Sequence, residues 1–403
     1  MIYDFDAAVD RGATASSKWD GRRERFGTDD LLPMWVADMD FPSPAPVVEA
    51  LVRRAQHGVF GYTLRPDSYY EAIVGWFARR HGLALEREWI AYSPGVVPAL
   101  HILVQTFTDP GDRVVIQPPV YHPFMNVIRA HGREIASNPL VPADGRYQID
   151  FDGLDDALKG SRLLILCSPH NPVGRVWTRA ELERLGELCL RRGVLVIADE
   201  IHCDLVFDGH RHVPFASLGP ELAQISFTCV APSKTFNVAG LYTACIVIPD
   251  AAKRERYEAA VRDLSIGGAN PFGAAALEAA YRHGDEWLEQ LLVYLDGNAR
   301  LVESHIRERI PEIRVRRPEG TYLAWLDCRG LGLTPERLDD WMRREARVGM
   351  DEGYKFGAGG EGFLRFNFGC PRPLVREALA RLERAAAALR RERQAAPERP
   401  GRK

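Results

Sequence analysis

Short apolar runs alternate with helix-like stretches along the middle of the chain. Runs this short and this apolar are typical of strands buried on both faces of a parallel sheet. The alternation therefore predicts an α/β protein built in layers. The candidate strands span residues 114–117, 163–167, 194–198, 225–230 and 245–248.

A clear helix signal lies between the second and third of these strands. Thr178 and Glu181 form a T-x-x-E capping box, leucines then recur on one face, and Gly193 follows the last turn. A capping box satisfies free amide groups at a helix start, and glycine commonly ends a helix. The segment therefore predicts a helix over about 178–193.

The pattern changes from Trp287, where a long amphipathic helix runs to Arg309 and Pro311 ends it. The rest mixes helix and strand signals, which predicts a second, smaller α+β domain. Its elements are strand-like 322–326, a helix begun by Thr334 and Pro335, strand-like 363–368, and a helix from Pro373. Beyond about 391 the chain is charged and lacks apolar periodicity, so we expect a disordered tail over 391–403.

Charge and composition narrow the class of protein. The 403 residues carry 52 basic and 55 acidic side chains, a near-neutral balance that argues against nucleic-acid binding. No segment approaches the roughly 20 apolar residues that cross a bilayer. The acidic start has no signal-peptide pattern, so we expect a cytoplasmic protein that does not enter membranes.

The seven cysteines and the six lysines each bear on where these residues lie and what they do. The cysteines are scattered without a C-x-x-C pair, which predicts reduced residues in the core. The lysines are outnumbered by 46 arginines. Five of them stand in polar, glycine-rich or terminal surroundings that indicate no chemical role: Lys18, Lys159, Lys253, Lys355 and Lys403.

Three motifs favour ordinary structure over chemistry. Residues 357–362 match G-x-G-x-x-G, but a strand-like segment follows where a dinucleotide site needs a helix, so we expect a loop. Ser233 lacks the G-x-S-x-G setting of a nucleophile. The His, Cys and Asp residues of 202–212 form a mixed loop without the usual zinc-ligand spacing, so we expect no metal.

Lys234 is the exception among the lysines, because apolar segments flank it on both sides. Burying an ammonium is costly, so either the lysine lies on a surface loop or it has a lowered pKa and forms a Schiff base. A pyridoxal-phosphate site also needs a carboxylate at the pyridine nitrogen, and Asp199 ends a buried strand. It needs phosphate donors as well, and the turn at Gly95 opens an apolar helix.

With these residues assembled, the chain resembles the class I/II aminotransferase superfamily of pyridoxal-phosphate enzymes, and within it the cystathionine β-lyase, or cysteine-S-conjugate β-lyase, branch. The matching segments lie in family order over residues 1–390. They are MWVADMDFPSP from Met34, FGYT from Phe60, YSPGVVPAL from Tyr92, PPVYHPF from Pro118, LCSPHNPVG from Leu166, ADEIHCDLVFDGHRHVPFASL from Ala198, APSKTFNVAGL from Ala231, EGTYLAWLD from Glu319 and GFLRFNFGCPR from Gly362.

The resemblance implies the aspartate aminotransferase-like fold, with a large three-layer α/β/α domain and a smaller α+β domain. The large, cofactor-binding domain would span 45–280. The small domain would combine 1–44 with 281–390. The protein would be a homodimer with shared active sites that acts on a small amino-acid substrate, a cysteine thioether.

The resemblance also implies a role for individual residues. Lys234 would hold pyridoxal 5'-phosphate as a Schiff base and later move the substrate's Cα proton, and Asp199 would pair with the pyridine nitrogen. Tyr121 would stack on the ring. The other cofactor contacts would come from Asn171, His202, Gly95, Val96, Val97, Ser233 and, from the partner subunit, Tyr62. Substrate contacts would come from Arg365, which would clamp the carboxylate, and from Asn171, Trp35 and Tyr62.

Two positions depart from the wider aminotransferase pattern. His202 stands where a tyrosine is usual, and Tyr242 stands where a phosphate-binding arginine is usual. Both changes suit the lyase branch. The implied reaction is an α,β-elimination that yields thiol, pyruvate and ammonia. An aminotransferase acting with a 2-oxo acid stays open as an alternative, and so does a regulator that binds a protein partner, although such a regulator would not need Lys234, Asp199 and Arg365.

Overall fold

The computed structural model describes residues 2–143 and 145–395. Its main feature is a seven-stranded sheet in the order β2-β10-β9-β8-β7-β3-β4. These strands are β2 (Ile90–Ser93), β3 (Arg113–Ile116), β4 (Glu134–Ser137), β7 (Ser161–Cys167), β8 (Leu195–Asp199), β9 (Ser226–Val230) and β10 (Ala244–Val247). All five predicted strands are therefore present, displaced by one or two residues at their ends.

One strand runs against the prediction of a parallel sheet. β10 pairs antiparallel with both β9 and β2, whereas β4, β3, β7, β8 and β9 pair in parallel. The reason lies in the connection from β9 to β10, which contains only a one-turn helix, α9 (Pro232–Thr235), and a short 3-10 turn. A parallel return needs a crossover that spans the whole sheet. Here the chain turns back at the carboxyl end of β9 instead.

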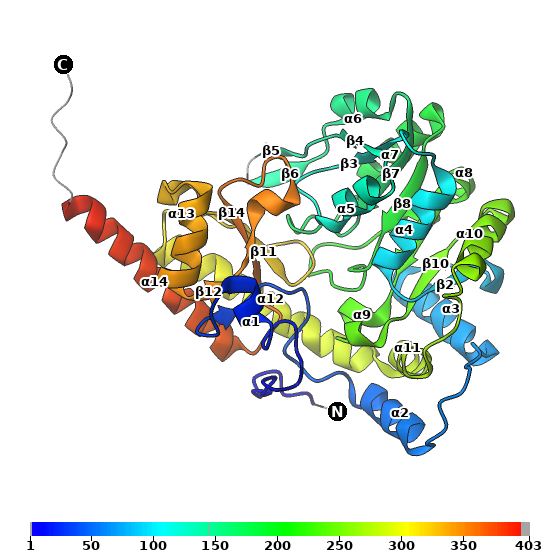
Figure 1. Cartoon of the computed structure of the whole chain (residues 1–403), viewed down its shortest axis with the longest axis horizontal. Helices are drawn as coiled ribbons and strands as arrows, with labels where there is room; N and C mark the ends of the chain where they lie inside the picture. The colour runs from blue at the N-terminus through cyan, green and yellow to red at the C-terminus, as the bar shows by residue number, and fades with distance from the viewer. Residues whose placement is uncertain (1, 144, 396–403) are drawn as a thin grey trace.

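Helices cover both faces of this sheet, as the layered pattern predicts (Figure 1). Side chains alternate along the strands: Val114 and Ile116 pack with one helical layer, and Val115 packs with the other. The first layer contains α4 (Val96–Phe107), α5 (Pro123–Ala130) and α10 (Ala251–Asp263), and the second contains α6 (Phe151–Leu158), α7 (Arg179–Arg192) and α8 (Pro220–Gln224). The β10 end is further covered by α3 (Asp67–His81) and α11 (Pro271–His283).

The predicted capping box forms at the start of α7. The Thr178 hydroxyl accepts from the Glu181 amide at 3.3 Å, and the Glu181 carboxylate accepts from the Thr178 amide at 2.8 Å. Gly193 ends the helix with a left-handed φ of 66°. Only a residue without a Cβ adopts this conformation at little cost, so the glycine signal in the sequence is also confirmed.

A second, smaller sheet follows the long helix α12 (Asp285–Arg309). Its strand order is β11-β14-β13. These strands are β11 (Leu323–Asp327), β13 (Asp351–Glu352) and β14 (Phe363–Asn367), and the helices beside them are α13 (Pro335–Asp340) and α14 (Arg372–Ala395). Residues 357–362 form the expected loop before β14.

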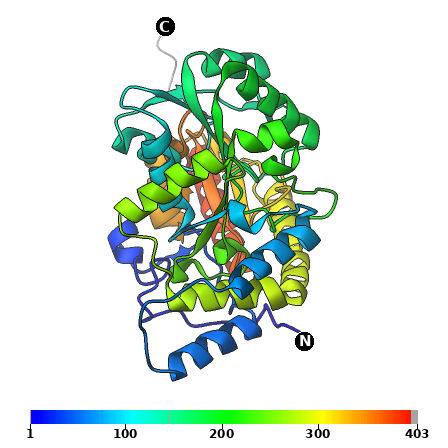
Figure 2. The same ribbon diagram turned by 90° about the vertical axis from the view of Figure 1, so that its right-hand side faces the viewer.

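The N-terminal segment packs with this C-terminal part. β1 (Leu32–Pro33) pairs in parallel with β12 (Val348–Gly349). In Figure 1 the dark blue helix α1 (Arg22–Phe26) accordingly lies beside the orange and red elements of the small sheet. The chain then leaves this region through 34–41 and enters α2 (Ala45–Gln56), which lies at the edge of the molecule in Figure 1 and again in Figure 2.

The prediction of a disordered tail from 391 is wrong for its first residues, because α14 continues to Ala395. Residues 391–395 are exposed. Arginine, glutamate, glutamine and alanine favour helix without any burial, so they extend a helix that earlier packing has already formed. The remaining part of that prediction, 396–403, lies outside the described residues.

All seven cysteines are buried and free, as the sequence predicts. Within 2–143 and 145–395, no helix combines the length and the apolar character that crossing a membrane requires.

Candidate active site

A cavity of about 330 Å³ opens where β8, α4 and α9 meet. In open α/β sheets, ligands bind beyond the carboxyl ends of the strands, and this cavity lies there. Nine of the twelve predicted site residues line it: Gly95, Val96, Val97, Tyr121, Asn171, Asp199, His202, Ser233 and Lys234. The other three, Tyr62, Arg365 and Trp35, lie outside its wall.

Lys234 reaches the cavity from the one-turn helix α9. Its Nζ donates a 2.6 Å hydrogen bond to the carbonyl oxygen of Ala37. Burial lowers the pKa of Lys234 to about 8, against the opposing attraction of Asp38. About a tenth of this amine is therefore neutral at pH 7, far more than for a lysine with the ordinary pKa of 10.5.

Asp199 ends β8 and lines the same cavity as Lys234. Burial raises the pKa of its carboxyl to about 7, although the Ile201 amide and the charge of Lys234 act in the opposite direction. The amide of Ile201, at 3.2 Å, donates to one carboxylate oxygen. No ion pair holds Asp199 within the described parts of the chain. A buried carboxylate is unstable as an anion unless a cation lies close to it. A cationic group of a ligand would therefore be stabilised next to Asp199.

The N-terminus of α4 forms another wall of the cavity. Gly95 precedes the helix, and Val96 and Val97 are its first residues. The first amide groups of a helix have no partner within it and attract anions. The Ser93 hydroxyl donates to the Gly95 carbonyl at 2.7 Å, which fixes the turn.

Tyr121 and His202 supply aromatic walls. Burial raises the pKa of Tyr121 to about 12, so its hydroxyl stays protonated. Burial, together with the positive charges of Lys234 and Arg365, lowers the pKa of His202 to about 3, so its imidazole is neutral. Its Nδ1 is buried and has no hydrogen-bond partner among the residues that the structure describes.

Arg365 lies beside the cavity on β14 and is buried. Its guanidinium donates to the Asn171 side-chain oxygen at 3.1 Å and to the Trp35 carbonyl at 3.0 Å, and it pairs with Asp351. Asp351 is its direct cross-strand neighbour on β13. Its Nε is buried and finds no partner within the described ranges, which leaves a donor for a ligand.

Trp35 contributes its main chain to this contact. Its indole Nε1 instead donates to the Lys18 carbonyl at 3.2 Å, and its ring packs edge-on against Phe26. A contact between Trp35 and the substrate stays a prediction. The carbonyl oxygen, which any residue type would supply, is what holds Arg365.

Trp35 belongs to a segment, residues 34–41, that we call the strap. Two asparagines fix it. Asn237, three residues after Lys234, exchanges hydrogen bonds with the amide and carbonyl of Met39 at 2.9 and 2.8 Å. Asn367, two residues after Arg365, donates to the Val36 carbonyl and, at 2.7 Å, to the Asp38 carbonyl. The strap is thus tied to both functional segments that it passes.

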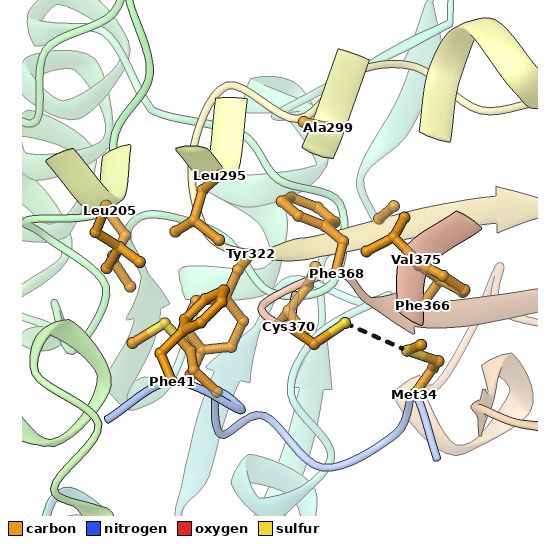
Figure 3. Close-up of a cluster of buried hydrophobic side chains, with 14 of the residues drawn as sticks. Met34, Phe41, Leu205, Leu295, Ala299, Tyr322, Phe366, Phe368, Cys370 and Val375 are labelled. Atoms are coloured by element: carbon orange, nitrogen blue, oxygen red, sulfur yellow. Dashed lines mark hydrogen bonds between the residues drawn. The ribbon is translucent and has the colours of Figure 1, made fainter. Parts of the chain in front are cut away.

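The strap is also anchored by apolar packing (Figure 3). Met34 and Phe41 point into a buried cluster that also contains Tyr322, Phe368 and Cys370. The Cys370 thiol lies 3.9 Å from the Met34 sulfur. The Tyr322 hydroxyl donates to the Ala37 carbonyl at 2.8 Å, the same oxygen that accepts from Lys234.

Lys18 is buried, although its neighbours in sequence are mostly polar. Its side chain is 0% exposed and its Nζ lies 2.7 Å from the Asp40 carboxylate. Asp40 also accepts from Arg11 at 2.7 Å and from the Trp19 indole at 2.9 Å. The polar neighbours of Lys18 in sequence hid this, because the buried partner is distant in the chain and belongs to the strap.

Tyr62 does not line the cavity of its own chain. It is fully exposed, and Leu64 and Phe60 nearby are exposed as well.

Tyr242, in contrast, lines the cavity although it is largely exposed. Its backbone is left-handed, with a φ of 46°.

Sequence reasoning missed several wall residues: Ala37, Cys167, Ile201, Ala239 and Thr243. Most are small or apolar and carry no chemical signal. Asp351 was missed as well, since only the register of β13 with β14 places it beside Arg365.

The polar residues of 202–212 do not converge on one point. His202 faces the cavity, His212 lies 2.9 Å from Glu200, and Asp204 lies 2.7 Å from His81. His81, Cys203 and Asp204 alone come close enough together to resemble a metal site within the described chain. Two of these three residues, His81 and Asp204, already form a hydrogen bond with each other.

The family model for aminotransferase class I and II matches residues 30–382. The chain belongs to the aminotransferase class I and II family. Cystathionine beta-lyase PatB of Bacillus subtilis (strain 168) is 47% identical over 383 residues, which cover 94% of this chain and 99% of PatB.

Two solved structures extend this likeness to the aminotransferase class I and II fold. Cystalysin from Treponema denticola, which contains pyridoxal 5'-phosphate, is 37% identical with a TM-score of 0.93, over 96% of this chain and 100% of that one. The C-S lyase from Staphylococcus hominis, also bound to pyridoxal phosphate, is 32% identical with a TM-score of 0.90, over 96% and 98%. The predicted fold class is therefore confirmed.

Proposed function

We propose that this protein is a pyridoxal-phosphate-dependent carbon-sulfur β-lyase. It cleaves L-cystathionine or related cysteine thioethers to a thiol, pyruvate and ammonia. The observation that carries the proposal is the single cavity that brings Lys234, Asp199 and the start of α4 together. The names of PatB, cystalysin and the staphylococcal C-S lyase support the same activity.

The residues around the cavity fit pyridoxal 5'-phosphate. Asp199, a buried carboxylate without a close cation, fits a protonated pyridine nitrogen. The amides of Gly95, Val96 and Val97 fit the phosphate, with Ser233 beside them. The contacts would be completed by Lys234 at the aldehyde carbon, Tyr121 on the ring face, and Asn171 and His202 at the ring edge. Bound there, the cofactor supplies an electron sink for the electron pair left when Cα loses its proton.

Lys234 moves the proton. Its pKa of about 8 leaves enough neutral amine to accept the Cα proton near neutral pH. Arg365 fixes the substrate by its carboxylate through the free Nε and a neighbouring Nη, while Asn171 and the Trp35 carbonyl hold the guanidinium still. A planar, bidentate grip of this kind also sets the orientation of Cα.

The elimination then breaks the bond between Cβ and sulfur, and the sulfur leaves with the electron pair as a thiolate that takes up a proton. Water hydrolyses the remaining unsaturated amine to pyruvate and ammonia, so the thioether and one water molecule account for all three products.

His202 and Tyr242 distinguish this site from the usual aminotransferase pattern. The neutral His202 imidazole offers its free Nδ1 where a tyrosine hydroxyl is usual. Tyr242 offers a hydroxyl where an arginine is usual, so less positive charge faces the phosphate. Amides and hydroxyls then carry most of the phosphate binding, which favours the lyase branch.

The proposal includes a cytoplasmic homodimer with two shared sites. Tyr62 is exposed on its own subunit, on a segment between α2 and α3 that runs along the outside of the molecule in Figure 2. Exposed apolar side chains at this density mark an interface. In the dimer, Tyr62 would reach the phosphate and substrate of the partner's site. The large domain would span 45–280, and 1–44 with 281–390 would form the small one.

The assignment of Lys234 is tested with Lys234→Ala, using Lys253→Ala on α10 as the matched control. Purified Lys253→Ala should keep the visible absorbance of the bound cofactor and full activity. Lys234→Ala should lose both. An unchanged absorption spectrum in Lys234→Ala would overturn the assignment.

An aminotransferase is the second candidate, because the matching family model bears that description. The two activities share every contact up to the loss of the Cα proton. They differ in the need for a 2-oxo acid acceptor. Pyruvate and free thiol formed from cystathionine without an acceptor indicate the lyase. Strict dependence on an acceptor indicates the aminotransferase.

A further inference from the structure

The residue after Lys234 is held from behind, on the side away from the cavity. Thr235 is fully buried and does not line the cavity wall. Its hydroxyl donates a 2.8 Å hydrogen bond to one carboxylate oxygen of Asp204. Side chains on the two neighbouring positions thus face opposite ways, one into the site and one into the core.

Asp204 is itself fixed by two further donors. The His81 Nε2 lies 2.7 Å and the Trp76 Nε1 lies 3.1 Å from its other carboxylate oxygen. Both donors belong to α3, and the Trp76 side chain is fully buried. Burial raises the pKa of Asp204, but His81, together with the Thr235 hydrogen bond and the charge of Arg80, lowers it more, so the pKa lies below its usual value.

Asp204 also belongs to the loop that carries Asp199 and His202. The turn is closed by the Leu205 amide, which donates to the His202 carbonyl at 2.9 Å. One buried carboxylate therefore connects the loop after β8, helix α3 and the turn that carries Lys234. A cation between His81, Cys203 and Asp204 would have to displace the bond between His81 and Asp204, so hydrogen bonding explains this cluster fully.

The turn needs an external anchor, because α9 has only four residues. A single helical turn is not stable by itself. Two backbone hydrogen bonds close its end, from the Phe236 amide to the Pro232 carbonyl at 2.9 Å and from the Val238 amide to the Ser233 carbonyl at 3.1 Å. On the cavity side, Asn237 ties the chain to the strap. On the core side, Thr235 makes the corresponding contact.

We propose that Thr235 and Asp204 are positioning residues for Lys234. Their hydrogen bond sets the rotation of α9 and so the place of the Lys234 amine in the cavity. This inference rests on the proposed role of Lys234. A displacement of about 1 Å at a reacting group can cost on the order of a hundredfold in rate, so a loosened turn reduces catalysis without removing any group that reacts.

The experiment compares pairs that differ only in the hydroxyl. Thr235→Val keeps the shape of threonine without its donor, and Thr235→Ser keeps the donor without the methyl group. Thr235→Ala compared with Thr235→Ser makes the same comparison should the valine variant fail to fold. Thr228→Val is the matched control, because Thr228 is buried on β9 and its hydroxyl has no partner in the described structure.

We expect Thr235→Val holoenzyme to lose roughly tenfold to a hundredfold in kcat with KM changed less than about twofold. Cofactor-free Thr235→Val should also bind added pyridoxal phosphate more slowly, followed by the visible absorbance. Thr235→Ser should recover most of both properties, and Thr228→Val should match the unaltered protein.

Equal kcat in Thr235→Val and the unaltered protein would overturn the inference. So would equal impairment of the serine and valine variants, or the same impairment in Thr228→Val, since these point to packing alone. Lys234→Ala separates the two proposals. If it keeps the cofactor absorbance, the proposed function fails; if it loses it while Thr235→Val is unaffected, only the positioning role fails.

Discussion

Arg365 on β14 donates a 3.1 Å hydrogen bond to the side-chain oxygen of Asn171, in the turn after β7. The contact joins the small sheet to the large one. In the proposed site, Asn171 contacts the cofactor and Arg365 contacts the substrate carboxylate. The hydrogen bond between Arg365 and Asn171 therefore fixes the position of the substrate relative to the cofactor.

Arg365→Lys tests the bidentate grip. Lysine keeps the charge but lacks the planar fork and cannot contact Asn171, the Trp35 carbonyl and a substrate carboxylate together. Losing a buried, charge-assisted contact costs about 2 to 5 kcal/mol, so kcat/KM should fall at least about thirtyfold, mainly through KM. Steady-state kinetics measures this. Arg329→Lys, at an exposed arginine just after β11 of the same sheet, is the control, and equal KM values in both variants would contradict the role of Arg365.

Asp199→Asn tests the carboxylate at the strand end. Asparagine has nearly the same shape but no charge to hold a protonated ring, so the electron sink weakens. We expect kcat to fall roughly a hundredfold or more, while the variant still binds pyridoxal phosphate. Absorption spectra at saturating cofactor separate loss of binding from loss of catalysis. Undiminished kcat would remove Asp199 from the mechanism.

The Lys18–Asp40 pair makes a prediction about stability. Removing one partner of a buried ion pair leaves the other uncompensated. Arg11 and the Trp19 indole still contact Asp40, so Lys18→Met should lower the free energy of unfolding by roughly 3 kcal/mol, the lower end of the usual range. Lys159→Met removes the largely exposed pair with Asp156 and should change it by less than about 0.5 kcal/mol. Urea unfolding of both variants measures the difference, and similar losses would show that burial at Lys18 carries no special energy.

Lys234 should react as an amine with a low pKa. Only the neutral form attacks an acylating reagent, so its reactivity rises as the pH rises through the pKa. With a pKa of about 8 rather than the ordinary 10.5, the half-maximal rate in cofactor-free protein falls near pH 8. Limited acetylation at a series of pH values, read by mass spectrometry of the peptide that contains Lys234, gives this midpoint. A midpoint above pH 10 would contradict the environment described for this amine.

Most strands and helices could be predicted from the sequence, because the spacing of apolar residues shows which positions are buried. The five strands, the α7 capping box and the loop at 357–362 all depend on local signals. The direction of β10 does not, since an apolar run of four residues reads the same in a parallel or an antiparallel pair. The short connection from β9 to β10 determines the antiparallel direction. The sequence of 231–243 mixes polar, apolar and glycine residues, so it did not reveal how short that connection is.

The candidate site divides in the same way. Lys234, Asp199 and Gly95 have side chains or turns whose chemistry is visible in sequence, and the cavity unites them. Lys18, Asp204 and Asp351 act through partners that are distant along the chain, so their neighbours in sequence gave no sign of burial. Trp35 and Ala37 contribute carbonyl oxygens, which no residue type encodes.

The central claim is that the site eliminates sulfur from Cβ. The most direct measurement incubates purified holoenzyme with L-cystathionine, without any 2-oxo acid, and follows pyruvate and free thiol over many turnovers. The account predicts both products in equal amounts from the unaltered protein and from Lys253→Ala, and neither from Lys234→Ala. Formation of product only after a 2-oxo acid is added, or equal activity in Lys234→Ala, would contradict it.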